Sequence, residues 1–318
     1  MALDPQAEIL LGLVKQAGLP EFWQLTPDQA REQFVERVRK MEARSSIHRS
    51  RDQRIPGPGS DIPIRIYWPR EARVGELFPC LLWFHGGGFV IGNLDTHDSA
   101  CRLFANQTDC MVVAVDYRLA PEFKFPAAVE DSHAALRWLA QHAREIGADP
   151  ERIAVGGDSA GANLATVMTL LARDEGYPKL VFQLLIYPCT APEPETASHH
   201  KFAEGYLLTR PNIVWFYKHY LRNQRDINDF RFAPLVAEDL SNLPPALLMV
   251  AGYDPLRDEG VEYATKLIEA GNRVTLVNYE GMMHGFILAG RVLDAARQAI
   301  AQSAAALREA FGGEGSEG

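Results

Sequence analysis

Short apolar segments recur along the middle and later parts of the chain. They are nearly continuous in hydrophobic side chains, as is typical of strands buried on both faces of a parallel sheet. These segments are residues 80–84, 111–115, 152–155, 181–187 and 246–250. An alternating stretch at 62–68 is typical of a half-buried strand, and the Pro and Gly residues of 54–60 predict a turn before it.

Segments with helical periodicity lie between several of the apolar runs, for example at 127–142 and 160–172. Strands and helices that alternate around central apolar strands predict an α/β fold. We therefore expect a mostly parallel, twisted sheet that is flanked by helices on both faces.

Two regions break this alternation. Residues 1–50 have helical spacing of apolar positions, and residues 189–243 contain an aromatic-rich helix that Thr209 caps. We expect both regions to form a helical layer over the sheet. The core is then built from residues 51–188 and 244–318.

The composition narrows the class of protein. The 318 residues are 47% hydrophobic, which allows a large core, and carry a net charge of −9, which disfavours binding to nucleic acid. The four cysteines form no CxxC pair and no cluster with zinc-ligand spacing, so we expect buried, reduced thiols and no metal site. The N-terminus lacks a basic region, and its apolar run is too short for a signal peptide or a membrane span. A cytoplasmic protein without membrane association is the default expectation.

The sequence Gly-Asp-Ser-Ala-Gly at 157–161 matches the GxSxG pattern of a nucleophile elbow. That chemistry needs a serine on a sharp turn between a strand and a helix, and the flanking glycines relieve the crowding of the turn. The expected strand at 152–155 precedes Ser159, and an expected helix follows it. We therefore predict that Ser159 is a catalytic nucleophile. The alternative is a glycine-rich turn with an idle serine.

A second glycine-rich segment, His85-Gly86-Gly87-Gly88, directly follows the expected strand at 80–84. Successive glycines allow backbone N–H groups to point at one spot, where they can stabilise the oxyanion of a tetrahedral intermediate. A flexible loop or a phosphate cradle is the alternative, but neither a Walker nor a GxGxxG pattern occurs here. We expect His85 to orient this loop and not to act as a base.

A general base and its acidic partner are expected late in the chain. His284 lies on a Gly-flanked loop after the expected strand at 273–279, and Asp254 directly follows the strand at 246–250. Both positions are at the carboxyl end of the sheet, where the sites of α/β proteins are built. The order Ser159, Asp254, His284 is the chain order of an α/β-hydrolase triad.

The other acidic and histidine residues have less distinctive positions. Asp258 and Glu259 are expected in the first turn of a helix, where we interpret them as structural. His97 follows the glycine segment and could lie near the site. The remaining histidines are expected at the surface: His48, His133, His142, His199, His200 and His219.

Together these motifs resemble those of the hormone-sensitive-lipase-like family of α/β-hydrolases, especially its microbial carboxylesterases. The matching segments, in the family's order, are His85–Phe89, Tyr117–Glu122, Gly157–Gly161, Asp254–Leu256 and His284–Phe286. The resemblance implies an oxyanion hole formed by the N–H groups of Gly87, Gly88 and Ala160, and a helical cap built from the N-terminus and the 189–243 insertion. It also implies supporting roles for His85, Gly86, Asp158 and Glu122.

The resemblance implies a carboxylesterase for short- to medium-chain acyl esters, which works through a Ser-His-Asp triad and an acyl-enzyme without a metal or cofactor. Two alternatives remain. One is a non-catalytic small-molecule receptor on the same fold. The other is an amide or carbamate hydrolase, which the same residues would serve.

Two further expectations concern binding surfaces. Aromatic and aliphatic residues of the cap segments and the glycine loop are candidates for an apolar substrate pocket, although they could equally form the core of the cap. These candidates are Trp23, Phe34, Phe89, Tyr206 and Leu207. The last expected strand, Arg273 to Tyr279, would be an edge of the sheet that could pair in a homodimer.

Overall fold

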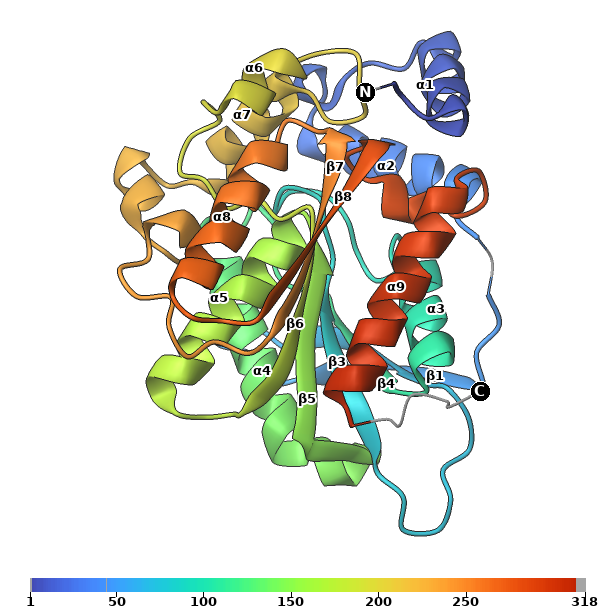
Figure 1. The fold of residues 1–318 in the computed structure, drawn as a ribbon, viewed down its shortest axis with the longest axis vertical. Helices are drawn as coiled ribbons and strands as arrows, with labels where there is room; N and C mark the ends of the chain where they lie inside the picture. Colours follow the sequence, from blue (N-terminus) through green and yellow to red (C-terminus); the bar gives the residue numbers. More distant parts are fainter. Residues whose placement is uncertain (1, 44, 313–318) are drawn as a thin grey trace.

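The computed structural model describes residues 2–43 and 45–312. Within them, one eight-stranded sheet runs through the centre in the order β1-β2-β4-β3-β5-β6-β7-β8 (Figure 1). The strands are β1 Arg49–Ile55, β2 Ile62–Trp68, β3 Phe78–Phe84, β4 Met111–Val115, β5 Ala148–Asp158, β6 Leu180–Ile186, β7 Ala246–Tyr253 and β8 Val274–Met283. Strands β3 to β8 are parallel, whereas β2 is antiparallel to both of its neighbours.

The central strands are those expected from the apolar runs. Leu82 of β3 lies between Val113 of β4 and Val155 of β5, and all three side chains are buried. Helices cover both faces of the sheet, which is why these strands are hydrophobic throughout and do not alternate. The predicted α/β fold is therefore confirmed.

The helices form layers around the sheet. Their bounds are α1 Pro5–Ala17, α2 Pro27–Met41, α3 Asp98–Thr108, α4 Ala127–Ile146, α5 Ala160–Glu175, α6 Ala197–Lys201, α7 Arg210–Tyr220, α8 Arg257–Glu269 and α9 Asp294–Ala310. Helices α3 and α9 lie on one face of the sheet, and α4, α5 and α8 lie on the other (Figure 1). Because β3 to β8 are parallel, their carboxyl ends lie together at one edge of the sheet, shown at the top in Figure 1.

Strand β1 was not expected, and its end overlaps the predicted turn at 54–60. Its sequence, Arg-Ser-Arg-Asp-Gln-Arg-Ile, is almost entirely polar, and only Ile55 is buried. β1 is an outer strand that pairs with β2 from Arg49 opposite Trp68 to Ile55 opposite Ile62. Pairing with a partner, and not its own apolar pattern, holds this strand in the sheet.

Helices α1, α2, α6 and α7 lie over the carboxyl ends of the strands, and we call these four helices the cap (Figure 1). Two of them begin at threonines whose hydroxyl groups accept a backbone N–H: Thr26 from Gln29 at 3.3 Å, and Thr209 from Asn212 at 3.4 Å. The N-terminal segment and the 189–243 insertion are far apart in the sequence, but their helices lie above the same edge of the sheet.

A search of the described residues for a helix long and apolar enough to cross a bilayer finds none.

Candidate active site

Ser159 lies on the sharp turn between β5 and α5. Its backbone has φ 54° and ψ −119°, a conformation that is costly for a residue with a side chain. The turn leaves no room for a side chain at its flanks. A Cβ on Gly161 would lie 1.9 Å from the carbonyl oxygen of Phe84, and one on Gly157 would lie 2.3 Å from the carbonyl carbon of Gly161. The glycines thus allow the turn that lifts the Ser159 hydroxyl off the sheet.

A chain of hydrogen bonds joins Ser159, His284 and Asp254. The Nε2 atom of His284 lies 2.9 Å from Ser159 Oγ, and its Nδ1 atom lies 2.7 Å from Asp254 Oδ2. Asp254 is fully buried, and its other oxygen accepts the N–H of Leu256 at 2.8 Å. Because the carboxylate can only accept here, it favours the tautomer of His284 that carries a proton on Nδ1. Nε2 is then free to accept the serine proton.

The glycine loop lies directly beside this serine. The N–H of Gly86 donates to Asp158 Oδ1 at 2.9 Å, and the same oxygen lies 3.0 Å from His97 Nε2. Gly87 and Gly88 have φ values of +124° and +57°, which L side chains rarely adopt. His97, which the sequence analysis placed near the site without a role, is therefore part of the support of this loop.

Three backbone N–H groups are available around Ser159. Within the described residues, those of Gly87, Gly88 and Ala160 donate to no protein acceptor. Ala160 is the first residue of α5, so its N–H has no partner inside the helix. Gly87, Gly88 and Ser159 line the same cavity. This arrangement can accommodate a negatively charged oxygen next to the serine hydroxyl.

His85 is buried below the loop and has a supporting position. Its ring stacks on that of Tyr117 at 4.3 Å between centroids, and its Nδ1 lies 2.8 Å from the carbonyl oxygen of Gly86. Burial, together with the nearby His97, lowers the pKa of His85 to about 3, so the ring is neutral at ordinary pH. A ring held in this way can orient the glycine loop.

Asp158 remains ionised although it is buried. Desolvation opposes the charge, but the charge and hydrogen bond of His97 and the N–H of Gly86 outweigh it, so the pKa of the carboxyl is lower than usual. Glu122, the other acidic supporting candidate, lies farther out on the surface. Its carboxylate pairs with Arg31 of α2 at 2.6 Å and so ties the cap to the loop after β4.

The serine opens into a small cavity of about 80 Å³ beneath the cap. Of the expected pocket residues, Phe34 and Leu207 line it. Trp23, Phe89 and Tyr206 do not. Trp23 is 47% exposed, Phe89 is buried against the ring of Tyr220 at 4.0 Å, and Tyr206 packs on Phe202 and Tyr253. Aromatic content alone does not tell which face of a segment turns toward the site.

Several lining residues were missed. Phe22 and Phe216 form part of the wall, and their rings lie 6.2 Å apart. Arg37 and Met41 line it too, on the same helix as Phe34. Phe34, Arg37 and Met41 are spaced so that they share one face of α2, and this spacing is visible in the sequence. Arg37 was nevertheless not predicted to line the pocket, because the candidates were chosen among apolar residues.

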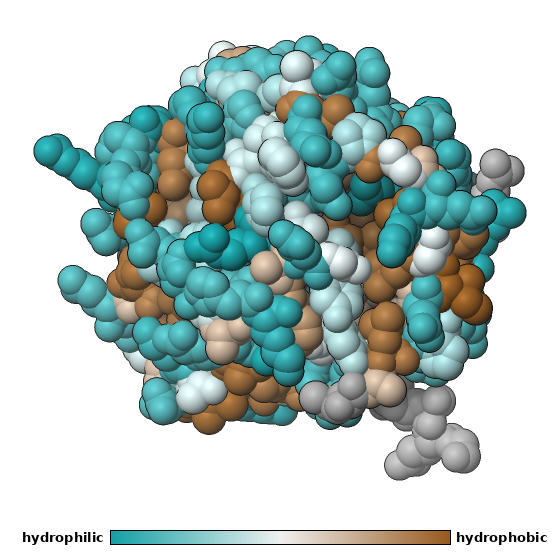
Figure 2. Space-filling view, turned by 90° about the horizontal axis from the view of Figure 1, so that it is seen from above, coloured by the Kyte–Doolittle hydropathy of each residue, from teal (hydrophilic) through white to brown (hydrophobic). Residues whose placement is uncertain are grey.

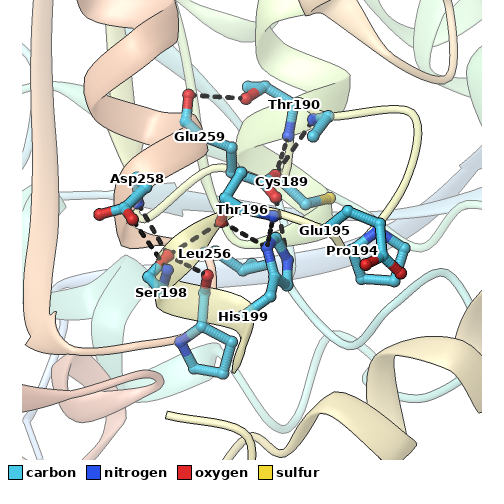
Figure 3. A network of polar contacts seen from close by, with 12 residues as sticks. Cys189, Thr190, Pro194, Glu195, Thr196, Ser198, His199, Leu256, Asp258 and Glu259 are labelled. Atoms are coloured by element: carbon cyan, nitrogen blue, oxygen red, sulfur yellow. Dashed lines mark hydrogen bonds and ion pairs between the residues drawn. The ribbon is translucent and has the colours of Figure 1, made fainter. Parts of the chain in front are cut away.

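The loop that carries Asp254 is held by the cap (Figure 3). Ser198 of α6 donates its hydroxyl to the carbonyl oxygen of Pro255 at 2.6 Å and accepts the N–H of Asp258 at 3.1 Å. The N–H of Ser198 in turn donates to the carboxylate of Asp258 at 2.8 Å. These three bonds connect the cap to the residues that follow the buried aspartate.

A second buried histidine–carboxylate contact involves Glu259 in the first turn of α8. Glu259 and His199 are both fully buried, and Glu259 Oε2 lies 3.2 Å from His199 Nε2 (Figure 3). The other oxygen of Glu259 accepts the N–H groups of Thr190 and Ala191. The prediction that His199 is a surface residue is therefore wrong. The short helix α6 packs against α8 and turns this histidine inward.

The remaining side chains with metal-binding chemistry are dispersed. Over residues 2–43 and 45–312, no three His, Cys, Asp or Glu side chains gather as a cation site. The four cysteines are free and buried, as expected, and burial raises the pKa values of their thiols.

Comparisons with known proteins agree with this geometry. A family model described as the alpha/beta hydrolase fold matches residues 81–288. Among curated proteins of Mycobacterium tuberculosis, the carboxylic ester hydrolase LipN is 50% identical over 74% of this chain and 64% of its own length, so this chain spans just under two thirds of that relative. The esterase LipI is 44% identical over 90% of both chains.

Among solved structures, the ester-hydrolase EH1AB1 from the metagenome of Lake Arreo, complexed with a derivative of bipyridine phosphonate, is 43% identical to this chain. It superposes with a TM-score of 0.93 over 98% of this chain and 99% of the other. The family match and these two kinds of relative agree with the motifs from His85 to Phe286. This chain belongs to the α/β-hydrolase family, in its hormone-sensitive-lipase-like branch.

Proposed function

We propose that this protein is a carboxylesterase that hydrolyses short- to medium-chain acyl esters through Ser159, His284 and Asp254. The single observation that carries the proposal is the hydrogen-bonded chain from Asp254 through His284 to Ser159, which ends in a cavity lined by the glycine loop. Curated relatives that are 44–50% identical are named as ester hydrolases.

In the first step, Ser159 attacks the ester carbonyl while Nε2 of His284 takes its proton. Asp254 keeps the imidazole in the required tautomer and stabilises the imidazolium that forms. The N–H groups of Gly87, Gly88 and Ala160 stabilise the oxyanion. His284 then protonates the leaving alcohol, and an acyl-enzyme results.

In the second step, water takes the place of the serine hydroxyl. His284 removes a proton from this water, which attacks the acyl carbon, and a second oxyanion forms in the same site. Collapse of this intermediate returns the proton to Ser159 and releases the acid. Removing one oxyanion donor costs about 10²–10³ in turnover in a known hydrolase, so these backbone groups supply a large part of the rate.

The test uses 4-nitrophenyl butyrate with the wild-type protein and the Ser159→Ala variant. The wild type should show a burst of nitrophenol and covalent labelling by an organophosphate, and the variant should lose both. A variant that turned over at a near-normal rate would exclude Ser159 as the nucleophile. A wild type without turnover would favour a small-molecule receptor, and turnover of matched amides or carbamates in preference to esters would favour the other hydrolase class.

The acyl length follows from the size of the cavity. Its volume of about 80 Å³ and its aromatic walls leave little space for a long chain. We expect kcat/KM to be highest for short 4-nitrophenyl esters and to fall toward long ones. A maximum at palmitoyl esters would overturn this expectation.

Three finer features belong to the same proposal. Residues 1–50 and 189–243 would work together as a cap domain over the core. The outer strand β8 would pair with a second copy in a homodimer, because no strand of the described residues lies along its far edge. Light scattering should then give twice the mass of one chain, and a monomer would contradict it. A cytoplasmic location is the third feature.

A further inference from the structure

Arg37 is the one lysine or arginine in the described wall of a mostly apolar cavity. The described lining consists of aliphatic and aromatic side chains, glycines, the reacting residues, Asp158 and this arginine. Arg37 also lines a second, outer groove between α1 and α2, and Met41 is the other residue that the two spaces share. The guanidinium therefore stands at the partition between the catalytic cavity and the groove beneath α1.

The apolar character of that side of the molecule is visible from the cap side. Figure 2 shows hydrophobic residues that come to the surface between hydrophilic ones, including on the side where α1 lies. Leu10, Leu13, Val14 and Leu25 line one side of the outer groove. Polar residues of α2, among them Glu32, Glu36 and Lys40, line its other side. Arg37 therefore has mostly apolar neighbours in the catalytic cavity and a mixed surface in the outer groove.

Arg37 differs from the neighbouring arginines of α2 in having no acidic partner. Arg31 pairs with Glu122 at 2.6 Å, and Arg39 pairs with Glu36 at 2.8 Å. Arg37 makes no ion pair or side-chain hydrogen bond with any residue of 2–43 or 45–312. Its guanidinium lies over the ring of Phe22, at 4.9 Å from the guanidinium carbon to the centroid.

The nearest acidic influence on Arg37 comes from Glu21. Burial lowers the pKa of the Arg37 guanidinium, and the charge of Glu21 raises it. Glu21 is engaged elsewhere, because its Oε2 accepts a hydrogen bond from Asn212 Nδ2 at 2.8 Å. Arg37 still carries its charge, since arginine does not lose its proton in proteins. A charge that is partly desolvated and unpaired is costly, so a bound anion would be stabilised there.

The position of Arg37 relative to the reacting atoms limits what it can bind. Phe216 lies against the glycine loop: a Cβ on Gly88 would come within 2.3 Å of its ring. Phe22 packs on Phe216, and Arg37 lies over Phe22. A layer of aromatic rings therefore separates the guanidinium from the oxyanion site. Arg37 can reach the far end of a substrate but not the carbonyl under attack.

We infer that Arg37 is a specificity residue that binds a carboxylate at the far end of the substrate, so that half-esters of dicarboxylic acids are a favoured substrate class. This inference rests on the proposed esterase function. A guanidinium offers paired N–H donors that match a carboxylate, and such charge-assisted bonds are strongest where water is largely excluded. The apolar walls would contact the methylene groups between the ester and the carboxylate.

The test compares two esters that differ only at the far end. They are 4-nitrophenyl hexanoate and mono-4-nitrophenyl adipate, in which a carboxylate replaces the terminal methyl group. The measured quantity is the ratio of kcat/KM for the adipate to kcat/KM for the hexanoate. Because both rates come from the same preparation, a partly unfolded variant lowers both and leaves the ratio unchanged.

In the Arg37→Met variant the ratio should fall about tenfold, as expected when a charged hydrogen bond is lost. Arg37→Lys should retain part of the preference, because it keeps the charge but loses the planar donor pair. Arg39→Met is the matched control, since Arg39 lies on the same helix but is 65% exposed and paired with Glu36. It should leave the ratio unchanged.

Two results would overturn the inference. An unchanged ratio in Arg37→Met would mean that the guanidinium only packs on Phe22. A gain for long neutral esters, with no loss for the adipate, would mean that Arg37 blocks passage into the outer groove. In both cases the wild type still hydrolyses the two esters. If it hydrolysed neither, the esterase function itself would fail.

Discussion

Two buried histidine–carboxylate pairs lie at the two ends of residues 254–259. At one end Asp254 lies 2.7 Å from His284, and at the other Glu259 lies 3.2 Å from His199. Both carboxylates are fully buried at the start of the same loop and helix. The two pairs have the same chemical groups but occupy different positions relative to the cavity.

The difference lies at the second ring nitrogen. In His284 this nitrogen faces the hydroxyl of Ser159 in the cavity, and in His199 it faces the half-buried hydroxyl of Thr196 at 2.6 Å, away from the cavity. A histidine–carboxylate pair can therefore activate a nucleophile only where its free nitrogen meets one that a substrate can reach. The other pair fastens the cap to the core.

The largest effect is expected from Asp254→Asn. The amide can donate to Nδ1 of His284 and so favours the tautomer with its proton on Nε2, which cannot accept from Ser159. We expect kcat for 4-nitrophenyl butyrate to fall about 10⁴-fold, as in a serine protease with the same change. Circular dichroism should show a folded protein. A loss below tenfold would remove Asp254 from the proposed triad.

Glu259→Ala should affect stability more than chemistry. It leaves His199 without its carboxylate and two backbone N–H groups without an acceptor. We therefore expect the free energy of unfolding, measured in urea, to fall by about 3–5 kcal/mol. Glu259→Gln retains an acceptor oxygen and should lose less. The folded variants should keep kcat within about tenfold of the wild type. A large loss of kcat without a loss of stability would mean that the two pairs do not differ as we propose.

His85 is also buried but, unlike His284, His199 and His97, has no carboxylate directly on its ring among the described residues, and its pKa is about 3. The unfolded chain, with a histidine pKa near 6.5, binds more protons than the folded chain between these values. Stability should therefore fall as pH decreases through this window, by about 1.4 kcal/mol per pH unit from this group.

The measurement is urea unfolding at pH 6.5 and pH 5.0. His85→Gln should make the free energy of unfolding less dependent on pH, by about 2 kcal/mol over this interval. Asp158 does not contribute to this comparison, because its pKa is lower than the usual value of 3.8 and so lies below the interval from pH 5.0 to 6.5. An equal pH dependence in the variant and the wild type would show that His85 is not held neutral.

The smallest effect is expected from Ser198→Ala, which removes the hydroxyl that joins α6 to Pro255 and Asp258, the residues between Asp254 and Glu259. Loss of the bonds to Pro255 and Asp258 should cost about 1–2 kcal/mol of stability and lower kcat a few-fold, because the loop that carries Asp254 is less firmly held. Ser132→Ala is the control. Ser132 is also buried, but its hydroxyl bonds only within α4, to Ala128, so kcat should not change. A change in kcat of the same size in both variants would contradict a positioning role for Ser198.

The sequence predicted the parallel strands and the positions of Ser159, Asp254 and His284 at their carboxyl ends, and the structure brings these three side chains together. It missed β1, whose polar residues form a strand only by pairing with β2. It also placed His199 at the surface, because a run of polar residues around a histidine does not reveal a buried glutamate far along the chain.

The sequence by itself determined those features that depend on the requirements of one short segment. Buried parallel strands require continuous apolar runs, and the turn at Ser159 leaves no space for side chains at Gly157 and Gly161, so both features are visible in the order of residues. Tertiary structure alone decided which cap residues line the cavity, that Glu259 meets His199, and that Arg37 has no acidic partner among the described residues. These are contacts between distant segments, and their free energies depend on burial and on neighbours that the local pattern does not specify.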